Sequence, residues 1–220
     1  MTVKLAPSSN HPDWSAAVVA LIAAGSRFDR RGWVPATSGN LSARVAGGRM
    51  AITASGCHKG ELTTRDFLDA DLAGVPRSGR RASAETGLHV MLYDRDPACG
   101  AVLHVHSPGS TLIGLSALAR GEVVFSGLEL LKAFPGVVSH AVTRRVPVVD
   151  NDQDITAMAR LVRPLLDRPD TLPAFVIAGH GVTAWGADVA SARRHIEALE
   201  FLFDIQLRQM GAQSWSGGPR

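Results

Sequence analysis

The chain has 220 residues and a mass of 23.2 kDa, which suits one domain with a substantial core. Its net charge is only +3, and its arginines cluster at most in pairs with no aromatic ladder among them. This pattern excludes a typical nucleic-acid-binding surface and leaves room for a small anionic substrate. The apolar runs are too short for a membrane span, and Cys57 and Cys99 form no CxxC motif, so we expect a cytoplasmic protein without disulfides.

Helical and strand patterns alternate along the chain. Asp13 is a candidate N-cap for a helix over 13–30, and two alternating segments around Gly47 and Gly48 predict a hairpin. The later elements are a helical turn and strand within 61–72, a helix capped by Ser83 and reaching about 93, a strand at 101–106, a helix at 109–119, a strand at 122–125, a helix at 127–133, a strand at 144–150, a helix at 154–167, strands at 173–181 and 182–186, and a long helix capped by Asp188.

This order predicts the fold class. Helices alternating with hairpins favour a single layered α/β domain, with a central mixed or antiparallel sheet flanked by helices. We expect the domain to occupy residues 13–209. Residues 1–12 are predicted to be a flexible N-terminus, and residues 210–220 a flexible tail.

Two histidines stand at the end of the apolar stretch AVLHVH. Alternate residues of a strand share a face, so His104 and His106 project side by side while Val105 faces the other way. Neutral imidazoles on one face are suitable ligands for zinc or a similar divalent ion, although a hydrogen-bonded pair has the same pattern. A second apolar strand, AFVIAGHG, also ends in a histidine, His180. Two buried strands that both end in histidine indicate a three-histidine metal site.

The remaining histidines have ordinary interpretations. His89 lies one helical turn after Glu85, where a hydrogen bond between the two suffices, and His195 is expected to be solvated on the long C-terminal helix. His140 lies in a loop.

A three-histidine metal site also needs a separate acid or base for proton transfer. Glu129 lies among apolar residues in FSGLELLKAF, and Glu85 lies in the first turn of the helix before the metal strand. Either glutamate could instead interact only with a helix dipole. Turns of small residues (Ser38, Gly39, Asn40, Ser55, Gly56 and Ser83) offer hydroxyl and backbone N–H groups for a phosphate.

At this point the sequence resembles the class II aldolase/adducin family. The stretches that carry the resemblance are TSGNLSAR, ITASG, SAETGLH, HVHS and GHGVTAWG, in this order, over about residues 13–209. Three further stretches, GLELLKAF, RRVPVVDND and ALEFLFDIQL, are more similar to a dehydratase branch of the family than to its sugar-phosphate aldolases.

The resemblance implies roles for the candidate residues. His104, His106 and His180 match the family's zinc ligands, and Glu129 matches the acid/base of the dehydratase branch. Glu85 matches the glutamate that is the base in the aldolases. The phosphate-binding turns match at Asn40, Ser55, Gly56 and Ser83. The aldolases often have two serines before that glutamate, whereas this chain has Ala84 in the second position, so one phosphate hydroxyl is missing.

The resemblance therefore implies a zinc-dependent dehydratase of a sugar phosphate, with one Zn2+ per subunit and a homotetramer whose sites lie near subunit contacts. Two alternatives stay open. An aldolase or epimerase would use the same metal for a different sugar phosphate, and an adducin-like interaction module would use the fold without catalysis. Substrate contacts distinguish the first alternative, and stoichiometric metal distinguishes the second.

Overall fold

The computed structural model describes residues 11–77 and 79–216. Within these residues, eight strands form one sheet in the order β3-β2-β1-β4-β8-β7-β6-β5. The strands are β1 (Asn40–Val45), β2 (Arg49–Thr53), β3 (Phe67–Asp71), β4 (Ala101–Val105), β5 (Glu122–Ser126), β6 (Thr143–Val149), β7 (Ala174–Ile177) and β8 (Gly181–Gly186). Only β6 and β7 pair in parallel, so the sheet is mixed, as the sequence predicted.

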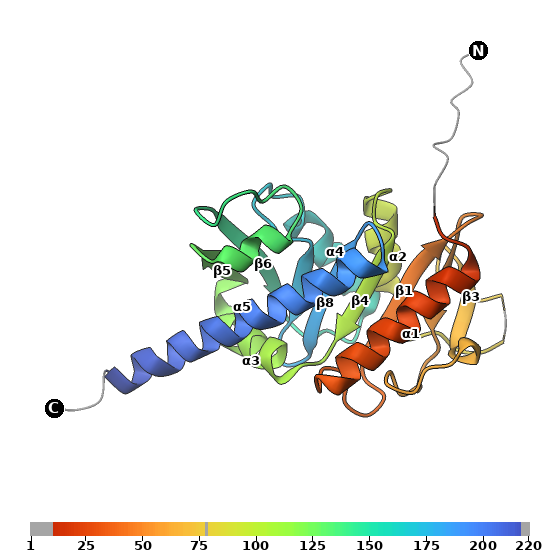
Figure 1. Ribbon diagram of the computed structural model, residues 1–220, viewed down its shortest axis with the longest axis horizontal. Coiled ribbons are helices and arrows are strands. Elements are labelled where there is room, and N and C mark those ends of the chain that lie inside the picture. The colour runs from red at the N-terminus through yellow and green to blue at the C-terminus, as the bar shows by residue number, and fades with distance from the viewer. Residues whose placement is uncertain (1–10, 78, 217–220) are drawn as a thin grey trace, which may run out of the picture.

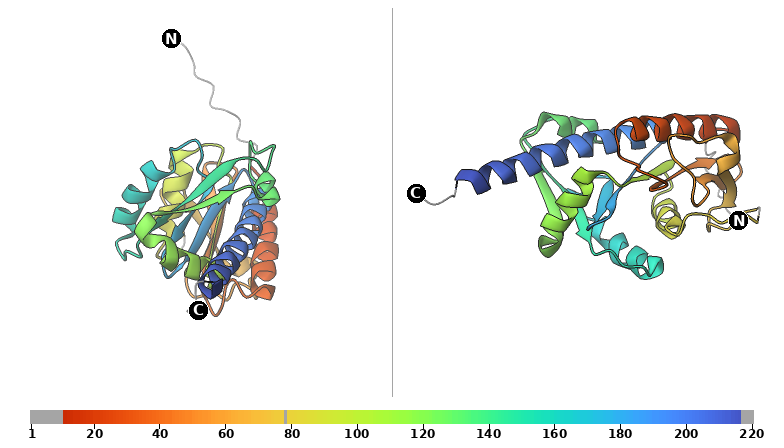
Figure 2. Two further views of the ribbon diagram at one scale, coloured as in Figure 1. Left: turned by 90° about the vertical axis from the view of Figure 1, so that its left-hand side faces the viewer. Right: turned by 90° about the horizontal axis from the view of Figure 1, so that it is seen from below.

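Helices cover both faces of this sheet (Figures 1 and 2). The α-helices are α1 (Trp14–Arg30), α2 (Thr86–Arg95), α3 (Pro108–Ala117), α4 (Ile155–Leu165) and α5 (Val189–Ser216). Short 3-10 helices are η1 (Thr64–Asp66), η2 (Leu118–Arg120) and η3 (Glu129–Ala133). Helices α1, α3 and α5 cover one face, and α2 and α4 cover the other. The described helices include none that is long and apolar enough to cross a membrane.

The alternation of β4 divides its side chains between two apolar cores. Leu103 and Val105 pack into the core under α1, α3 and α5, whereas Val102 packs into the core under α2 and α4. His104 lies on the same face as Val102 because it is two residues further along the strand. The prediction that Val105 faces away from the histidines is therefore confirmed.

Helix boundaries follow the capping residues with one exception. Asp13 accepts a hydrogen bond from the amide of Ala16 (2.8 Å), and Asp188 accepts one from that of Ser191 (2.6 Å), as expected for N-caps. Ser83 does not cap α2: the helix begins at Thr86, and the Ser83 hydroxyl accepts a hydrogen bond from Asn40 instead.

The C-terminal helix is longer than expected. Helix α5 continues to Ser216, past residue 210, where the sequence analysis placed the start of a flexible tail. The expected flexible N-terminus falls mostly on residues 1–10, and the last four positions of the expected tail are 217–220; both segments lie outside the described residues.

Candidate metal centre and pocket

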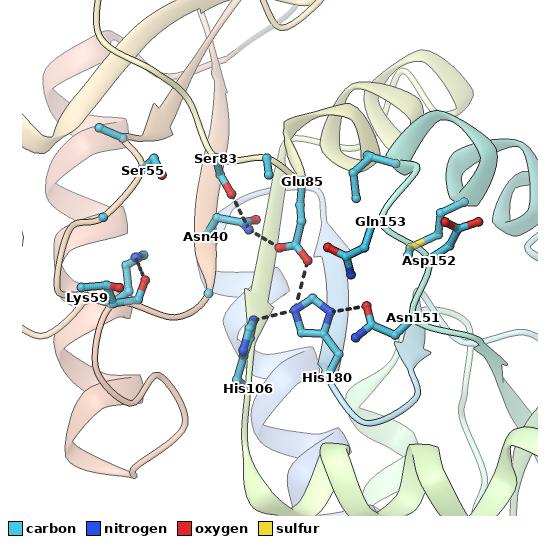
Figure 3. A pocket seen from close by; sticks show the side chains of 17 residues that line it. Asn40, Ser55, Lys59, Ser83, Glu85, His106, Asn151, Asp152, Gln153 and His180 are labelled. Carbon is cyan, nitrogen blue, oxygen red and sulfur yellow. Dashed lines mark hydrogen bonds and ion pairs between the residues drawn. The ribbon is translucent and has the colours of Figure 1, made fainter.

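The three histidines His104, His106 and His180 meet at one end of the sheet. Figure 3 shows two of them, His106 and His180, beside Glu85. His104 belongs to β4, and His106 follows it directly. His180 occupies the turn between β7 and β8, next to Gly181, and β8 pairs antiparallel with β4. Because the register places Val105 opposite Val182, the turn before β8 lies beside the end of β4. Pairing of two strands thus joins residues that are 74 positions apart in the sequence.

The nitrogen atoms of these rings point toward one another. The Nε2 atom of His180 lies 3.0 Å from Nε2 of His106 and 3.4 Å from Nε2 of His104. The Glu85 carboxylate completes the group, 3.3 Å from His104 Nε2 and 3.1 Å from His180 Nε2. One donor atom from each of the four residues lies within 4.8 Å of all the others.

Hydrogen bonds on the far side of the His104 and His180 rings determine which ring nitrogen carries the hydrogen. His104 Nδ1 lies 3.1 Å from the carbonyl oxygen of Val182, and His180 Nδ1 lies 3.3 Å from the side-chain oxygen of Asn151. Both oxygens can only accept, and the Thr183 hydroxyl, 3.0 Å from His104 Nδ1, can accept as well, so Nδ1 carries the hydrogen in each ring. In the neutral imidazole, Nε2 then presents a lone pair to the centre of the cluster, which is the arrangement of metal-binding histidines.

Burial keeps the rings of His104 and His106 neutral. Desolvation, followed by the neighbouring histidine His180, lowers the pKa of His104 to about 3. Desolvation and then the other two histidines lower the pKa of His106 to about 3. The Nε2 lone pairs of His104 and His180, which lie 3.4 Å apart, repel each other unless a cation lies between them. The observed Nε2 separations match the roughly 3.3 Å edge of a tetrahedral site with metal–nitrogen bonds of about 2.0–2.1 Å. The donor set therefore fits a divalent metal ion.

Three members of the cluster, Glu85, His106 and His180, line a pocket of about 390 Å³, and His104 is buried behind them. The small-residue turns line one side of the pocket, through Gly39, Asn40, Ser55, Gly56 and Ser83. Ser38 does not line the pocket, and its hydroxyl is buried without a partner within the described part of the chain. Asn40 donates to Ser83 Oγ (3.1 Å) and to Glu85 Oε2 (2.5 Å), so it holds the carboxylate next to the histidines.

Other pocket residues were not found from the sequence. They are Thr37, Lys59, Asn151, Asp152, Gln153, Ile155 and Met158, the last five in the loop after β6 and the first turn of α4. Figure 3 shows Lys59 on one side of the pocket and Asn151, Asp152 and Gln153 on the opposite side. The sequence does contain a signal for the last five residues, because the loop follows the end of β6, at the same end of the sheet as His180.

Glu129 lies at the other end of the sheet. Strand β6 runs parallel to β7 and so ends beside the histidines. Strand β5 is antiparallel to β6, so it ends at the opposite end of the sheet. Glu129 follows β5, bonds to Lys132 (2.6 Å) and faces His140 (3.5 Å), and its side chain is 71% exposed. The prediction that apolar residues surround Glu129 is wrong, because the 3-10 helix η3 turns Leu131 inward and leaves Glu129 in solvent.

Two histidines also differ from their ordinary interpretations. His89 bonds to the Ser42 hydroxyl (2.7 Å) and not to Glu85, because α2 turns this ring onto β1. His195 is buried and not solvated: its Nδ1 donates to the carbonyl oxygen of Trp185 (2.7 Å), and its ring stacks on Phe134.

A buried carboxyl group lies behind the metal centre. Glu200 of α5 accepts a hydrogen bond from the Ser107 hydroxyl (2.6 Å), and Ser107 directly follows His106. Its other oxygen has no partner among the described residues. Burial raises the pKa of Glu200 to about 7.

The fold and the site together define a class of protein, and comparison with known sequences agrees. Residues 19–207 match the family model described as Class II Aldolase and Adducin N-terminal domain. The chain belongs to this family.

Individual relatives are more specific. The chain is 52% identical over 193 residues to a methylthioribulose-1-phosphate dehydratase of Methylococcus capsulatus, a match that covers 88% of this chain and 94% of the relative. It is 48% identical over 190 residues to the enzyme of the same name from Pseudomonas paraeruginosa, covering 86% and 92%.

Solved structures agree on the fold. YgbL from Klebsiella pneumoniae, a putative aldolase/epimerase/decarboxylase, superposes with a TM-score of 0.75 at 25% identity and covers 88% of this chain and 89% of that one. An L-fuculose 1-phosphate aldolase has a TM-score of 0.76 at 21% identity over 96% and 92% of the two chains.

Proposed function

We propose that this chain is a zinc-dependent dehydratase of methionine salvage. Its substrate would be 5-methylthioribulose 1-phosphate, and its product 2,3-diketo-5-methylthiopentyl 1-phosphate. The observation that carries the proposal is the convergence of His104, His106, His180 and Glu85, three of which line one polar pocket. The relatives named as methylthioribulose-1-phosphate dehydratases support the choice of substrate.

The histidines are the proposed metal ligands. His104, His106 and His180 would hold one Zn2+ through their Nε2 atoms, which already face one another. A zinc ion bound there would act as a Lewis acid toward the substrate's C2 carbonyl and C3 hydroxyl oxygens, which makes the C3 proton more acidic.

The pocket orients an extended substrate. In the proposal, the phosphate lies on the side of Ser55, Gly56 and Ser83, and the carbonyl carbon lies beside the histidines. The methylthio end then reaches the start of α4, where Ile155 and Met158 supply apolar surface. The polar side of the pocket, the histidines and the apolar side thus follow the same order as the phosphate, the carbonyl and the methylthio group along the substrate.

Proton transfer is assigned to the two glutamates. Glu129 removes the proton from C3 and delivers it to the C4 hydroxyl, which leaves as water. Glu85, held by Asn40, accepts the proton of the resulting C3 enol hydroxyl and returns a proton to C4, which completes the diketone. The sum of these steps is the loss of one water molecule.

Glu129 can play this part only in an oligomer. In its own chain it lies at the end of the sheet opposite the histidines. We therefore propose a cytoplasmic homo-oligomer, a tetramer as in the resemblance, in which Glu129 of one copy reaches the pocket of the next. The exposure of Glu129 and of nearby Leu130 is consistent with a surface that another copy covers.

Mixed oligomers test this assignment. Glu129→Gln should retain stoichiometric zinc and lose roughly 10²–10⁴-fold in dehydratase turnover, and His180→Ala should lose zinc and turnover. Refolding the two variants together in equal amounts should restore about a quarter of the wild-type activity, because half of the chains supply each group independently. Activity is followed by the absorbance of the diketone.

Two results would contradict the proposal. Near-wild-type turnover of Glu129→Gln refutes the role of Glu129, and failure of mixed oligomers to regain activity refutes its delivery from another copy. A parallel incubation with L-fuculose 1-phosphate separates dehydration from aldol cleavage, since cleavage releases dihydroxyacetone phosphate. If the protein cleaves L-fuculose 1-phosphate and does not dehydrate methylthioribulose 1-phosphate, the proposed reaction and substrate are wrong.

A further inference from the structure

Lys59 is a buried cation without an anionic partner. The residue is 1% exposed, and its ammonium group donates to the carbonyl oxygens of Thr37 (2.9 Å) and Cys57 (2.6 Å). Neither acceptor carries a charge, and no carboxylate within residues 11–77 and 79–216 forms an ion pair with Lys59. Taking an ammonium group out of water is costly unless an opposite charge compensates it. The unliganded fold therefore retains an unbalanced positive charge.

The local backbone fixes this cation in place. The carbonyl oxygen of Lys59 packs against Gly25 of α1 so closely that a Cβ atom at Gly25 would overlap it. Helix α1 thus anchors the segment that carries Lys59, and the two carbonyl acceptors orient its ammonium group. Two of the three ammonium hydrogens are used in this way, and the third has no acceptor among the described residues.

The unbalanced charge faces the small-residue side of the pocket (Figure 3). The other groups on that side are neutral, and they are fewer than the sequence suggests. Both hydrogens of the Asn40 amide are already donated, to Ser83 and Glu85. The hydroxyls of Ser55 and Ser83 still have hydrogens to donate. Hydroxyls and backbone N–H groups are neutral, so they would leave the charge of a doubly charged ligand uncompensated, and Lys59 supplies the missing positive charge.

We infer that Lys59 is the residue that makes this pocket select a phosphate monoester, because it is the counter-ion of the bound phosphate. This inference deepens the proposed function: it assigns the charge that recognises the phosphate end of the substrate, and it holds for any phosphate monoester that enters the pocket. The lowered pKa that burial imposes on Lys59 is then reversed when the dianion binds.

Binding of inorganic phosphate to the full-length protein tests the inference. Isothermal titration calorimetry at pH 7.5 is carried out on the metal-free protein, so that phosphate cannot bind to zinc, and is repeated on the zinc-loaded protein. Lys59→Met should weaken phosphate binding roughly 10- to 100-fold in both forms, the range of a lost charge-assisted hydrogen bond. Ser83→Ala should weaken it less, by roughly 3- to 10-fold.

The matched control removes a charge elsewhere. Arg208→Met takes away an exposed cation whose partner is Asp204, outside the pocket, and should leave phosphate binding unchanged. Circular dichroism and a zinc content equal to wild type establish that Lys59→Met is folded. Should that variant be unfolded, Lys59→Gln repeats the titration with a neutral side chain that can still donate to the carbonyls.

The outcomes separate the inference from the proposed function. Unchanged phosphate affinity in a folded Lys59 variant overturns the inference, whatever the activity of the enzyme. Weakened phosphate binding supports it even if the protein dehydrates no methylthioribulose phosphate, in which case only the substrate assignment fails.

Discussion

The two ends of the sheet are built on different electrostatic principles. At the end with the histidines, charged and polar groups are crowded together out of water: the buried ammonium of Lys59 has no anionic partner among the described residues, and the Nε2 atoms of His104 and His180 lie 3.4 Å apart. At the other end, Glu129 forms an ion pair with Lys132 in solvent and lies 3.5 Å from the exposed His140. Exposed pairs contribute little to stability, and removing one partner leaves the other hydrated. Buried groups without partners are costly to fold, so their presence indicates a ligand that supplies what is missing.

In this protein, the burial of a charged side chain, more than its residue type, indicates whether it lies in a binding site. Glu129 and Glu85 are both glutamates near the start of a helix, and the sequence treats them alike. The structure separates them by burial: the Glu85 side chain is 13% exposed and the Glu129 side chain 71%. A carboxylate at the exposed end can join the chemistry only when another molecule covers it.

The largest expected effect tests whether the buried end binds a metal. His104→Ala should abolish stoichiometric zinc and reduce turnover by at least about 10³-fold, because the metal loses a ligand that is fixed by Val182. The control is His140→Ala at the exposed end, which should retain full zinc content, as measured by plasma mass spectrometry. Equal zinc in both variants would mean that His104 is no ligand.

The second prediction compares two glycines with similar backbone angles. Gly39 (φ +74°) lies at the buried end, where an added Cβ would lie 2.6 Å from the carbonyl oxygen of His104, and Gly127 (φ +71°) lies at the exposed end with open space around it. Gly39→Ala should cost about 3 kcal/mol of unfolding free energy, from strain plus overpacking. Gly127→Ala should cost about 1 kcal/mol, from strain alone. Urea unfolding measures both, and equal costs would show that the strand accommodates the clash.

The third prediction concerns the carboxyl group behind the metal centre. The pKa of Glu200 is raised by burial from the ordinary value of 4.5 to about 7. Between these values the unfolded chain loses its proton and the folded chain keeps it, so this group lowers stability as the pH rises from about 4.5 to 7. Glu200→Gln removes the effect.

The measurement is a difference between two pH values. Relative to wild type, Glu200→Gln should gain about 3 kcal/mol of unfolding free energy at pH 8 compared with pH 4.5, as determined by urea titration. The exposed Asp204, one turn further along α5, provides the matched control, since Asp204→Asn should show no comparable pH-dependent gain. A flat difference for Glu200→Gln would show that this carboxyl group is ionised in the folded protein.

Much of the fold and part of the site could be predicted from the sequence because both depend on local periodicity. The alternation in AVLHVH places His104 and His106 on one face, and glycines around His180 mark a second strand end. The burial of Lys59 and of His195 could not be predicted in this way, because it results from contacts with α1 and Phe134, which are distant in sequence. The separation of Glu129 from the histidines depends on strand order, which periodicity does not encode.

The pairing of β4 with β8 sets a limit on how the sequence can change. His104 lies opposite Thr183, and two residues along a strand restore the same face. Deleting a single residue within β4 would turn Val105 toward the cavity and both imidazoles into the hydrocarbon layer under α3 and α5. Insertions in the surface turns would leave the chelating atoms where they are. We therefore expect the protein to tolerate insertions and deletions in its surface turns and to tolerate none within β4, although the two regions are only a few residues apart.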